Sequence, residues 1–201
     1  MTTIAEKSAT AAAEQAAGPH LDPAAESAVV DHDVLRDILA GRWAEQRRQA
    51  RRLAADPRLH IAPGTHWSEH REKTFDNLSI LAESDAVRAG LPASLGGSGD
   101  PASYLSGFEE FVLADPSLQI KAGVQWGLFG GAIENLGTER HQQMVTDLMN
   151  LDALGCFAMT ERGHGSDVQS LETTATYDPE TQEFILNSPT ASAEKWYIGN
   201  A

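Results

Sequence analysis

Apolar residues recur at helical spacing over the first three quarters of the chain. Leu35, Leu39 and Trp43 follow one another at intervals of four residues, and the same stripe continues as far as Leu53. Acidic side chains suit the first turn of a helix, and Asp31 stands in front of this stripe. The pattern therefore predicts that order begins near Asp31, with a helix over 31–53.

Further helices are expected in the same part of the chain, separated by short segments rich in glycine and proline. The apolar spacing and the flanking Pro, Gly and Thr residues predict them over 66–86, 102–114, 117–136 and 138–150. The segment at 117–136 contains several glycines, which are poor for an isolated helix but allow close backbone approach, so we expect it to be buried.

The period of the pattern changes after residue 150. Two β-type runs at 171–177 and 183–187 flank the turn sequence DPETQE, and a third run begins at Lys195. The closing WYIGNA lies within that third run, so we expect the chain to be the front part of a longer protein. The predicted fold class is α+β, and its parts are a disordered leader (1–30), a helical domain (31–150) and an incomplete β-barrel domain (151–201).

Composition narrows the function classes. The 201 residues carry 15 Lys and Arg against 29 Asp and Glu, a net charge of −14, which argues against binding to nucleic acid or to an anionic membrane. The longest uncharged apolar stretch, 122–133, is too short to span a bilayer. Cys156, within LGCFAM, is the one cysteine of the chain, and we expect it to pack in the core.

Two polar clusters have simple interpretations. The first predicted helix carries five arginines, which are Arg42, Arg47, Arg48, Arg51 and Arg52. A solvated helix face that pairs with the surplus of acids is favoured over an anion-binding site. His66 and His70 stand four residues apart, but the rest of a ligand set cannot be identified, so we predict no metal site.

The stretch GCFAMTERGHGSDVQSLETTAT (155–176) carries the strongest chemical signal. Gly163, Gly165 and the short Ser166 permit a backbone that bends sharply and exposes its N–H groups. Such a loop suits an anionic ligand, and a bound phosphate is one candidate.

Together, TE, GHGS, LETTAT and KW at these separations resemble the acyl-CoA oxidase branch of the acyl-CoA dehydrogenase superfamily. The resemblance is strong over 150–201, weaker over GLPASLGG (90–97) and NLGTERHQ (135–142), and only architectural over 31–85. It implies the acyl-CoA dehydrogenase-like fold, with FAD as the cofactor.

The resemblance also implies roles for individual residues. Thr160 holds the position whose hydroxyl donates to the pyrimidine edge of the flavin. Ser166, with Gly165 beside it, matches the place where a hydroxyl and neighbouring amides meet the cofactor pyrophosphate or the nearby acyl-CoA. We expect Glu161 to face away from that anion, and we assign no acid-base role to His164.

At the end of the chain the resemblance implies a flavin-contacting glycine, Gly199, where dehydrogenases have a threonine or serine. Trp196 and Tyr197 match a pair of aromatic residues that can pack against the ring or fill the sheet core. The sequence departs from the family in having tyrosine as the second aromatic residue and IGNA in place of paired glycines. These departures bear on the environment of the ring.

The implied reaction is α,β-desaturation of a fatty acyl-CoA, with molecular oxygen as the acceptor of the electrons. The family's catalytic base is a glutamate of the carboxy-terminal helical domain, so no catalytic residue is expected in this chain, which alone should be inactive. The resemblance implies a homodimer or larger assembly at full length, located in the cytoplasm, or in the peroxisome of a eukaryote. The alternatives are a dehydrogenase that uses an electron-transfer flavoprotein, and a non-catalytic fragment of this fold.

Overall fold

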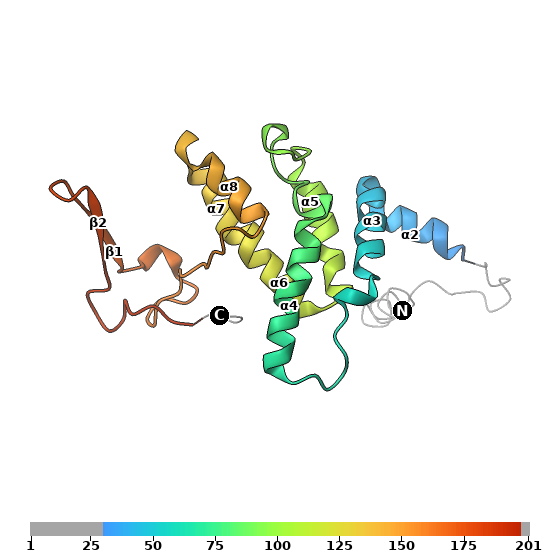
Figure 1. Cartoon of the computed structure of the whole chain (residues 1–201), viewed down its shortest axis with the longest axis horizontal. Helices are drawn as coiled ribbons and strands as arrows, with labels where there is room; N and C mark the ends of the chain where they lie inside the picture. The colour runs from blue at the N-terminus through green and yellow to red at the C-terminus, as the bar shows by residue number, and fades with distance from the viewer. Residues whose placement is uncertain (1–29, 198–201) are drawn as a thin grey trace, which may run out of the picture. The chain divides into compact units, whose positions relative to one another are not determined.

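The computed structural model describes residues 30–197. Its contacts divide the chain into two units, with the boundary in the sequence between Gly41 and Arg42. Most of the expected leader, residues 1–29, lies outside the described residues. The helices and strands of the described part are α2 (His32–Ala40), α3 (Ala44–Ala54), α4 (Trp67–Ala82), α5 (Pro101–Phe108), α6 (Pro116–Ala122), α7 (Gly131–Leu136), α8 (Gln142–Met149), β1 (Thr174–Asp178) and β2 (Glu183–Asn187) (Figure 1).

Helix α2 begins where the sequence predicts it. The Asp31 side chain accepts hydrogen bonds from the N–H groups of Asp33 and Val34, at 3.0 and 3.1 Å, which satisfies two donors of the first turn. The single helix expected over 31–53 is wrong, however. Gly41, with φ of 61°, ends α2, and a short 3₁₀ turn separates it from α3. This backbone conformation suits glycine and interrupts the predicted stripe.

The core of the second unit lies among its helices. Helix α3 packs against α5, α4 against α6, and α8 against α7 and the π-helical segment Gly123–Gly130 (Figure 1). The side chains that are almost completely enclosed include Leu59, Leu81, Phe111, Leu118 and Leu148. Burial of each such side chain contributes about 1.5–3 kcal/mol, so this cluster fixes the helical part.

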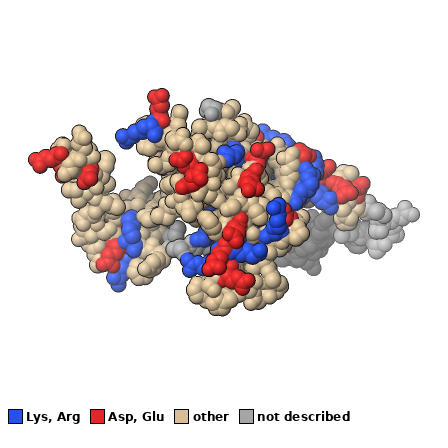
Figure 2. Space-filling view, viewed as in Figure 1, with Lys and Arg blue, Asp and Glu red and all other residues tan. Residues whose placement is uncertain are grey.

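The arginine-rich face of α3 pairs with acids, as its composition predicts. Arg47 contacts Glu109 at 2.6 Å and Glu110 at 3.0 Å, and Arg51 contacts Glu110 at 2.8 Å. The carboxylate of Glu110 is almost fully buried, so these pairs are more than surface contacts. Figure 2 shows acidic and basic side chains lying next to one another on the visible face of the helical part, without a large patch of one charge.

Strands β1 and β2 form an antiparallel hairpin around the predicted turn. Thr174 pairs with Asn187 at the open end and Asp178 with Glu183 at the turn. The apolar side chains of the hairpin are exposed, including Leu186 at 75%. The backbones of the two strands are therefore paired, whereas no group among the described residues buries the apolar side chains of the hairpin.

Candidate cofactor-binding site

An extended segment leads from α8 into the predicted flavin loop. After a turn at Leu151, where φ is 64°, and bends at 152–153, every second residue along 154–158 is exposed, as expected of an extended backbone, and Cys156 lies on the exposed side. The expected core position of Cys156 is therefore wrong. Apolar neighbours predicted burial, but the alternation places the thiol toward solvent.

Gln125, from the π-helical segment, holds the start of this extended segment through hydrogen bonds. Its side-chain amide donates to the carbonyls of Leu148 at 2.9 Å and Ala153 at 2.8 Å, and its oxygen accepts from the N–H of Gly155 at 3.0 Å. The side chain is buried, with donors and acceptor satisfied. The only sequence signal for this role was a lone glutamine in an apolar run.

The loop itself closes through backbone hydrogen bonds. Glu161 and His164 exchange two of them, at 3.1 and 3.0 Å, and the N–H of Gly163 donates to the carbonyl of Ser192 at 2.9 Å. A Cβ atom on Gly163 would collide with the Ser192 hydroxyl and press on the Ser192 Cβ at 3.1 Å, so this close approach favours glycine. The first glycine of GHGS, Gly163, is thus explained by a contact with a segment about thirty residues later.

The Glu161 carboxylate is buried beneath the loop. It accepts hydrogen bonds from the N–H groups of Glu172 and Thr173, both at 2.9 Å, and from the Lys195 ammonium at 3.2 Å. Burial raises the pKa of Glu161, but hydrogen bonds from Glu172, from the side chain and backbone of Thr173 and from Lys195 outweigh it and lower the pKa to about 2. Sequence reasoning named Glu161 only as facing away from an anion and gave Lys195 no role.

Thr160 lies directly before this carboxylate and is half-buried. Its carbonyl accepts a hydrogen bond from the N–H of Trp196 at 3.0 Å, which places the third predicted run beside it. Within residues 30–197, its hydroxyl contacts no hydrogen-bonding partner. A donor on a fixed backbone therefore remains available to a ligand.

Gly165 and Ser166 occupy the outer part of the loop and are exposed. In the described part of the chain, the backbone N–H groups of Gly165, Ser166 and Asp167 donate to no protein group. A Cβ at Gly165 would meet only open space. Consecutive free N–H groups of this kind suit an anion such as a pyrophosphate.

Trp196 and Tyr197 follow the strand-like pairing at Lys195. Their rings are 6.2 Å apart and exposed, Tyr197 at 82%. Neither fills a sheet core among the described residues, so each presents an apolar face. Gly199, the other predicted contact, lies outside the described residues.

His164 turns toward a second carboxylate. Its Nε2 lies 3.1 Å from Glu172 Oε1, and the Thr190 hydroxyl donates to the other oxygen of Glu172 at 2.8 Å. Hydrogen bonds from His164, Thr190 and Ser192 lower the pKa of Glu172. His164 therefore supports the loop through Glu172.

The histidine pair of α4 is used for structure. The ring of His66 accepts from the N–H of Ser68 at the start of the helix, and His70 contacts the buried Asp115 at 2.9 Å. Asp115 in turn accepts from the N–H of Ser117 at the start of α6. The two histidines thus have separate partners.

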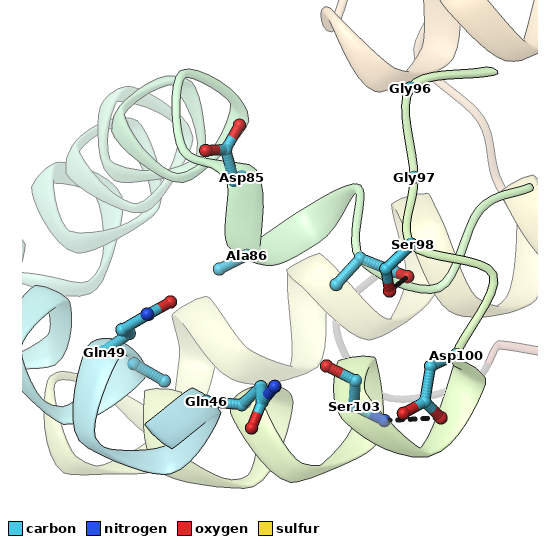
Figure 3. Close-up of a pocket in the computed structure, with 12 residues that line it drawn as sticks. Gln46, Gln49, Asp85, Ala86, Gly96, Gly97, Ser98, Asp100 and Ser103 are labelled. Carbon is cyan, nitrogen blue, oxygen red and sulfur yellow. Dashed lines mark hydrogen bonds between the residues drawn. The ribbon is translucent and has the colours of Figure 1, made fainter. Parts of the chain in front are cut away.

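A cavity of about 550 Å³ opens in the helical part between α3, α5 and the glycine-rich segment 96–100. Its polar groups come from Gln46, Gln49, Asp85, Ser98, Asp100 and Ser103 (Figure 3). The Asp100 carboxylate already has partners within the protein. It accepts hydrogen bonds from the Trp43 indole at 3.0 Å and from the N–H groups of Ala102 and Ser103. The cavity shares no residue with the loop.

The residues present fit a flavin dinucleotide. Among residues 30–197, the Thr160 hydroxyl and the N–H groups at 165–167 have no hydrogen-bonding partner, and the 196–197 segment offers aromatic faces. The bond between Trp196 and Thr160 brings the aromatic segment to the threonine. A flavin dinucleotide requires groups of these kinds, namely hydrogen-bond donors for its pyrimidine edge and pyrophosphate and flat surfaces for its ring.

No protein-family profile matches the chain. It is, however, 45% identical over 134 residues to acyl-coenzyme A oxidase 2, peroxisomal, of Arabidopsis thaliana, a match that covers 66% of this chain and 19% of the relative. It is also 47% identical over 94 residues to the acyl-coenzyme A oxidase-like protein of Mus musculus, covering 46% and 15%. The chain thus spans about a fifth of the length of the curated relatives it matches.

The chain is also similar to solved structures of acyl-CoA oxidases and of an acyl-CoA dehydrogenase. Acyl-CoA oxidase 1 from Yarrowia lipolytica matches with a TM-score of 0.60 and 28% identity, over 78% of this chain and 22% of that one. Butyryl-CoA dehydrogenase from Megasphaera elsdenii matches with a TM-score of 0.56 and 26% identity, over 71% and 39%. The resemblance to the acyl-CoA oxidase branch and the predicted α+β fold class, part of the acyl-CoA dehydrogenase-like fold, are confirmed.

Among the described residues, no helix has the length and apolar character that crossing a bilayer requires.

Proposed function

We propose that this chain is part of an FAD-dependent enzyme that desaturates fatty acyl-CoA at the α and β carbons and passes the electrons to oxygen. The observation that carries the proposal is the hydrogen bond between Thr160 and Trp196, beside a loop whose N–H groups at 165–167 donate to no group among the described residues. The similarity to acyl-CoA oxidases supports it. Bound FAD would supply the hydride acceptor.

Each predicted site residue then has a defined task. With FAD bound, the Thr160 hydroxyl would donate to the pyrimidine edge of the flavin and stabilise negative charge on the ring. The N–H groups of Gly165 and Ser166, with the Ser166 hydroxyl, would hold the pyrophosphate. Tyr197 and Trp196 would cover the ring and exclude water from it. We assign the catalytic base to a glutamate of the remaining part of the protein.

The exposed hairpin supports the view that further protein takes part. An isolated two-stranded hairpin is marginally stable in water, and the apolar side chains of β1 and β2 are exposed. We propose that the remainder of an oxidase-length protein covers them, that the protein assembles as a homodimer or larger, and that the described chain alone is inactive. Its location stays a prediction, cytoplasmic or, in a eukaryote, peroxisomal.

Oxygen as the acceptor is proposed from the resemblance, which implies that Gly199 stands where dehydrogenases have a flavin-contacting threonine or serine. The butyryl-CoA dehydrogenase match favours a second candidate, a dehydrogenase that passes electrons to an electron-transfer flavoprotein. Gly199→Thr separates the two. It should lower peroxide formation while dye-driven turnover with the same acyl-CoA persists. A wild-type enzyme that is inert toward oxygen would favour the dehydrogenase.

Thr160→Ala in the full-length protein tests the proposed site. The loss of a charge-assisted hydrogen bond should cost the reduction step about 1–3 kcal/mol and leave substrate affinity nearly unchanged, because the charge develops during hydride transfer. Stopped-flow mixing with acyl-CoA measures both quantities, and Thr160→Ser is the matched control that keeps a hydroxyl. An unchanged reduction rate in Thr160→Ala would remove Thr160 from the site.

A further inference from the structure

Both neighbours of Thr160 are bound by a single lysine. The Lys195 ammonium donates to the carbonyl of Met159 at 3.0 Å and to the Glu161 carboxylate at 3.2 Å. The backbones of Glu161 and Lys195 also form an antiparallel bridge, and the next N–H, that of Trp196, donates to the carbonyl of Thr160. Thr160 is thus held from the residue before it, from the residue after it and through its own carbonyl.

The Glu161 carboxylate extends this arrangement to a third segment. Its two oxygens accept the N–H groups of Glu172 and Thr173, where the chain enters β1. The Glu161 side chain is completely buried, whereas that of Lys195 is 35% exposed. A buried charge costs free energy unless it is paired and hydrogen-bonded, and here three donors satisfy it.

We propose that Glu161 and Lys195 are positioning residues of the flavin site, which fix the Thr160 hydroxyl and the Trp196–Tyr197 segment in one geometry and balance the charge beside the ring. This proposal rests on the proposed function. At metal sites, removal of the residues that orient the ligands typically costs ten- to a hundredfold in affinity or activity, and we expect an effect of that order here.

The charge balance gives the proposal a distinctive consequence. Positive charge near a flavin stabilises its anionic reduced form and raises the reduction potential, and negative charge lowers it. Glu161→Gln leaves the Lys195 charge unbalanced and should raise the potential of bound FAD. Lys195→Met leaves a buried carboxylate unbalanced and should lower it. A pair that only supports the fold would not move the potential in opposite directions.

The experiment uses the full-length protein loaded with FAD. The potential is measured by equilibration with redox dyes, and the FAD dissociation constant by fluorescence titration, for wild type, Glu161→Gln, Lys195→Met and Lys195→Arg. We expect opposite shifts of the potential in the first two variants and a roughly ten- to hundredfold weaker FAD affinity in each. Lys195→Arg keeps the charge and should lie closest to wild type. Glu183→Gln, an exposed carboxylate on β2, is the control with the same change of net charge.

Opposite shifts with rescue by arginine support the proposal. Unchanged potentials in folded variants, or shifts of the same sign, overturn it even where the melting temperature falls. If Glu161→Gln does not fold, the comparison of Lys195→Met with Lys195→Arg decides, because Lys195 is partly exposed. A wild-type protein that binds no FAD overturns the proposed function as well, whereas an active wild type with unmoved variants overturns only the positioning role.

Discussion

The helical part of the second unit, 42–149, and the loop and hairpin that follow it, 154–197, are held together by different forces. The first encloses a cluster of aliphatic and aromatic side chains such as Phe111 and Leu148. In the second, the buried residues among those described are Glu161 and Ala193. The helical part is thus stabilised by apolar burial, and the loop by a hydrogen-bonded carboxylate.

This difference matches the proposed tasks of the two regions. Apolar packing is non-directional and gives a stable scaffold, whereas hydrogen bonds to a buried charge fix atoms in one geometry. The proposed site residues Thr160 and Trp196 lie beside the hydrogen bonds of Lys195 and Glu161. A cofactor site needs this kind of positional order.

The largest expected effect comes from the apolar core. Phe111→Ala should lower the free energy of unfolding by about 3–5 kcal/mol, because it removes a fully buried ring. Urea denaturation followed by circular dichroism at a helical wavelength measures it. A loss under about 1 kcal/mol would show that this core does not carry the stability of the helical part.

The second effect concerns the ion pairs of the helical part. Glu110→Gln should cost about 2–4 kcal/mol, because the charge that pairs with Arg47 and Arg51 disappears while both guanidinium groups stay in place. The same denaturation measurement applies, with the exposed Glu109 changed to Gln as the control. Equal losses in the two variants would contradict the difference in burial.

The third prediction concerns pH. The pKa of Glu161 is lowered to about 2 in the folded protein from an ordinary 4.5, so its stabilising contribution is complete above pH 4.5 and is lost as the pH falls toward 2. The stability difference between wild type and Glu161→Gln should therefore be constant near neutrality and shrink in that window. Thermal melts at stepped pH measure it. A difference that shrinks already between pH 7 and 5 would contradict the lowered pKa.

The smallest effect is expected on the hairpin. Leu186→Thr in the 201-residue chain should change stability by less than about 0.5 kcal/mol, because the side chain is exposed and threonine favours strands. The same substitution in the full-length protein should cost more if the rest of the protein covers this face. Equal, small effects in both would argue against that coverage.

Much of the helical part could be predicted from the sequence, since apolar spacing and capping residues are local signals. The break at Gly41 was missed because the stripe from Leu35 to Trp43 continues through it in sequence. The hairpin was found from its alternation and its turn. The exposure of Cys156 was missed because it depends on the direction of an extended backbone, which the apolar neighbours do not reveal.

The candidate site is a prediction from the sequence, whereas the contacts that support its backbone could not be predicted from it. The residues predicted at the flavin, Thr160, Gly165, Ser166, Tyr197 and Gly199, remain predictions from the resemblance. The partners that hold the loop are distant in the chain. Gln125 reaches Gly155, and Lys195 reaches Met159. Such contacts become visible only when the backbone is folded.

Anaerobic mixing of the full-length protein with a fatty acyl-CoA tests the central claim most directly. The account predicts that the protein purifies with FAD, that the absorbance of the oxidised flavin is bleached by the acyl-CoA, and that oxygen restores it with formation of hydrogen peroxide. A protein that binds no FAD when it is supplied, or a bound flavin that acyl-CoA of any chain length leaves oxidised, would contradict it.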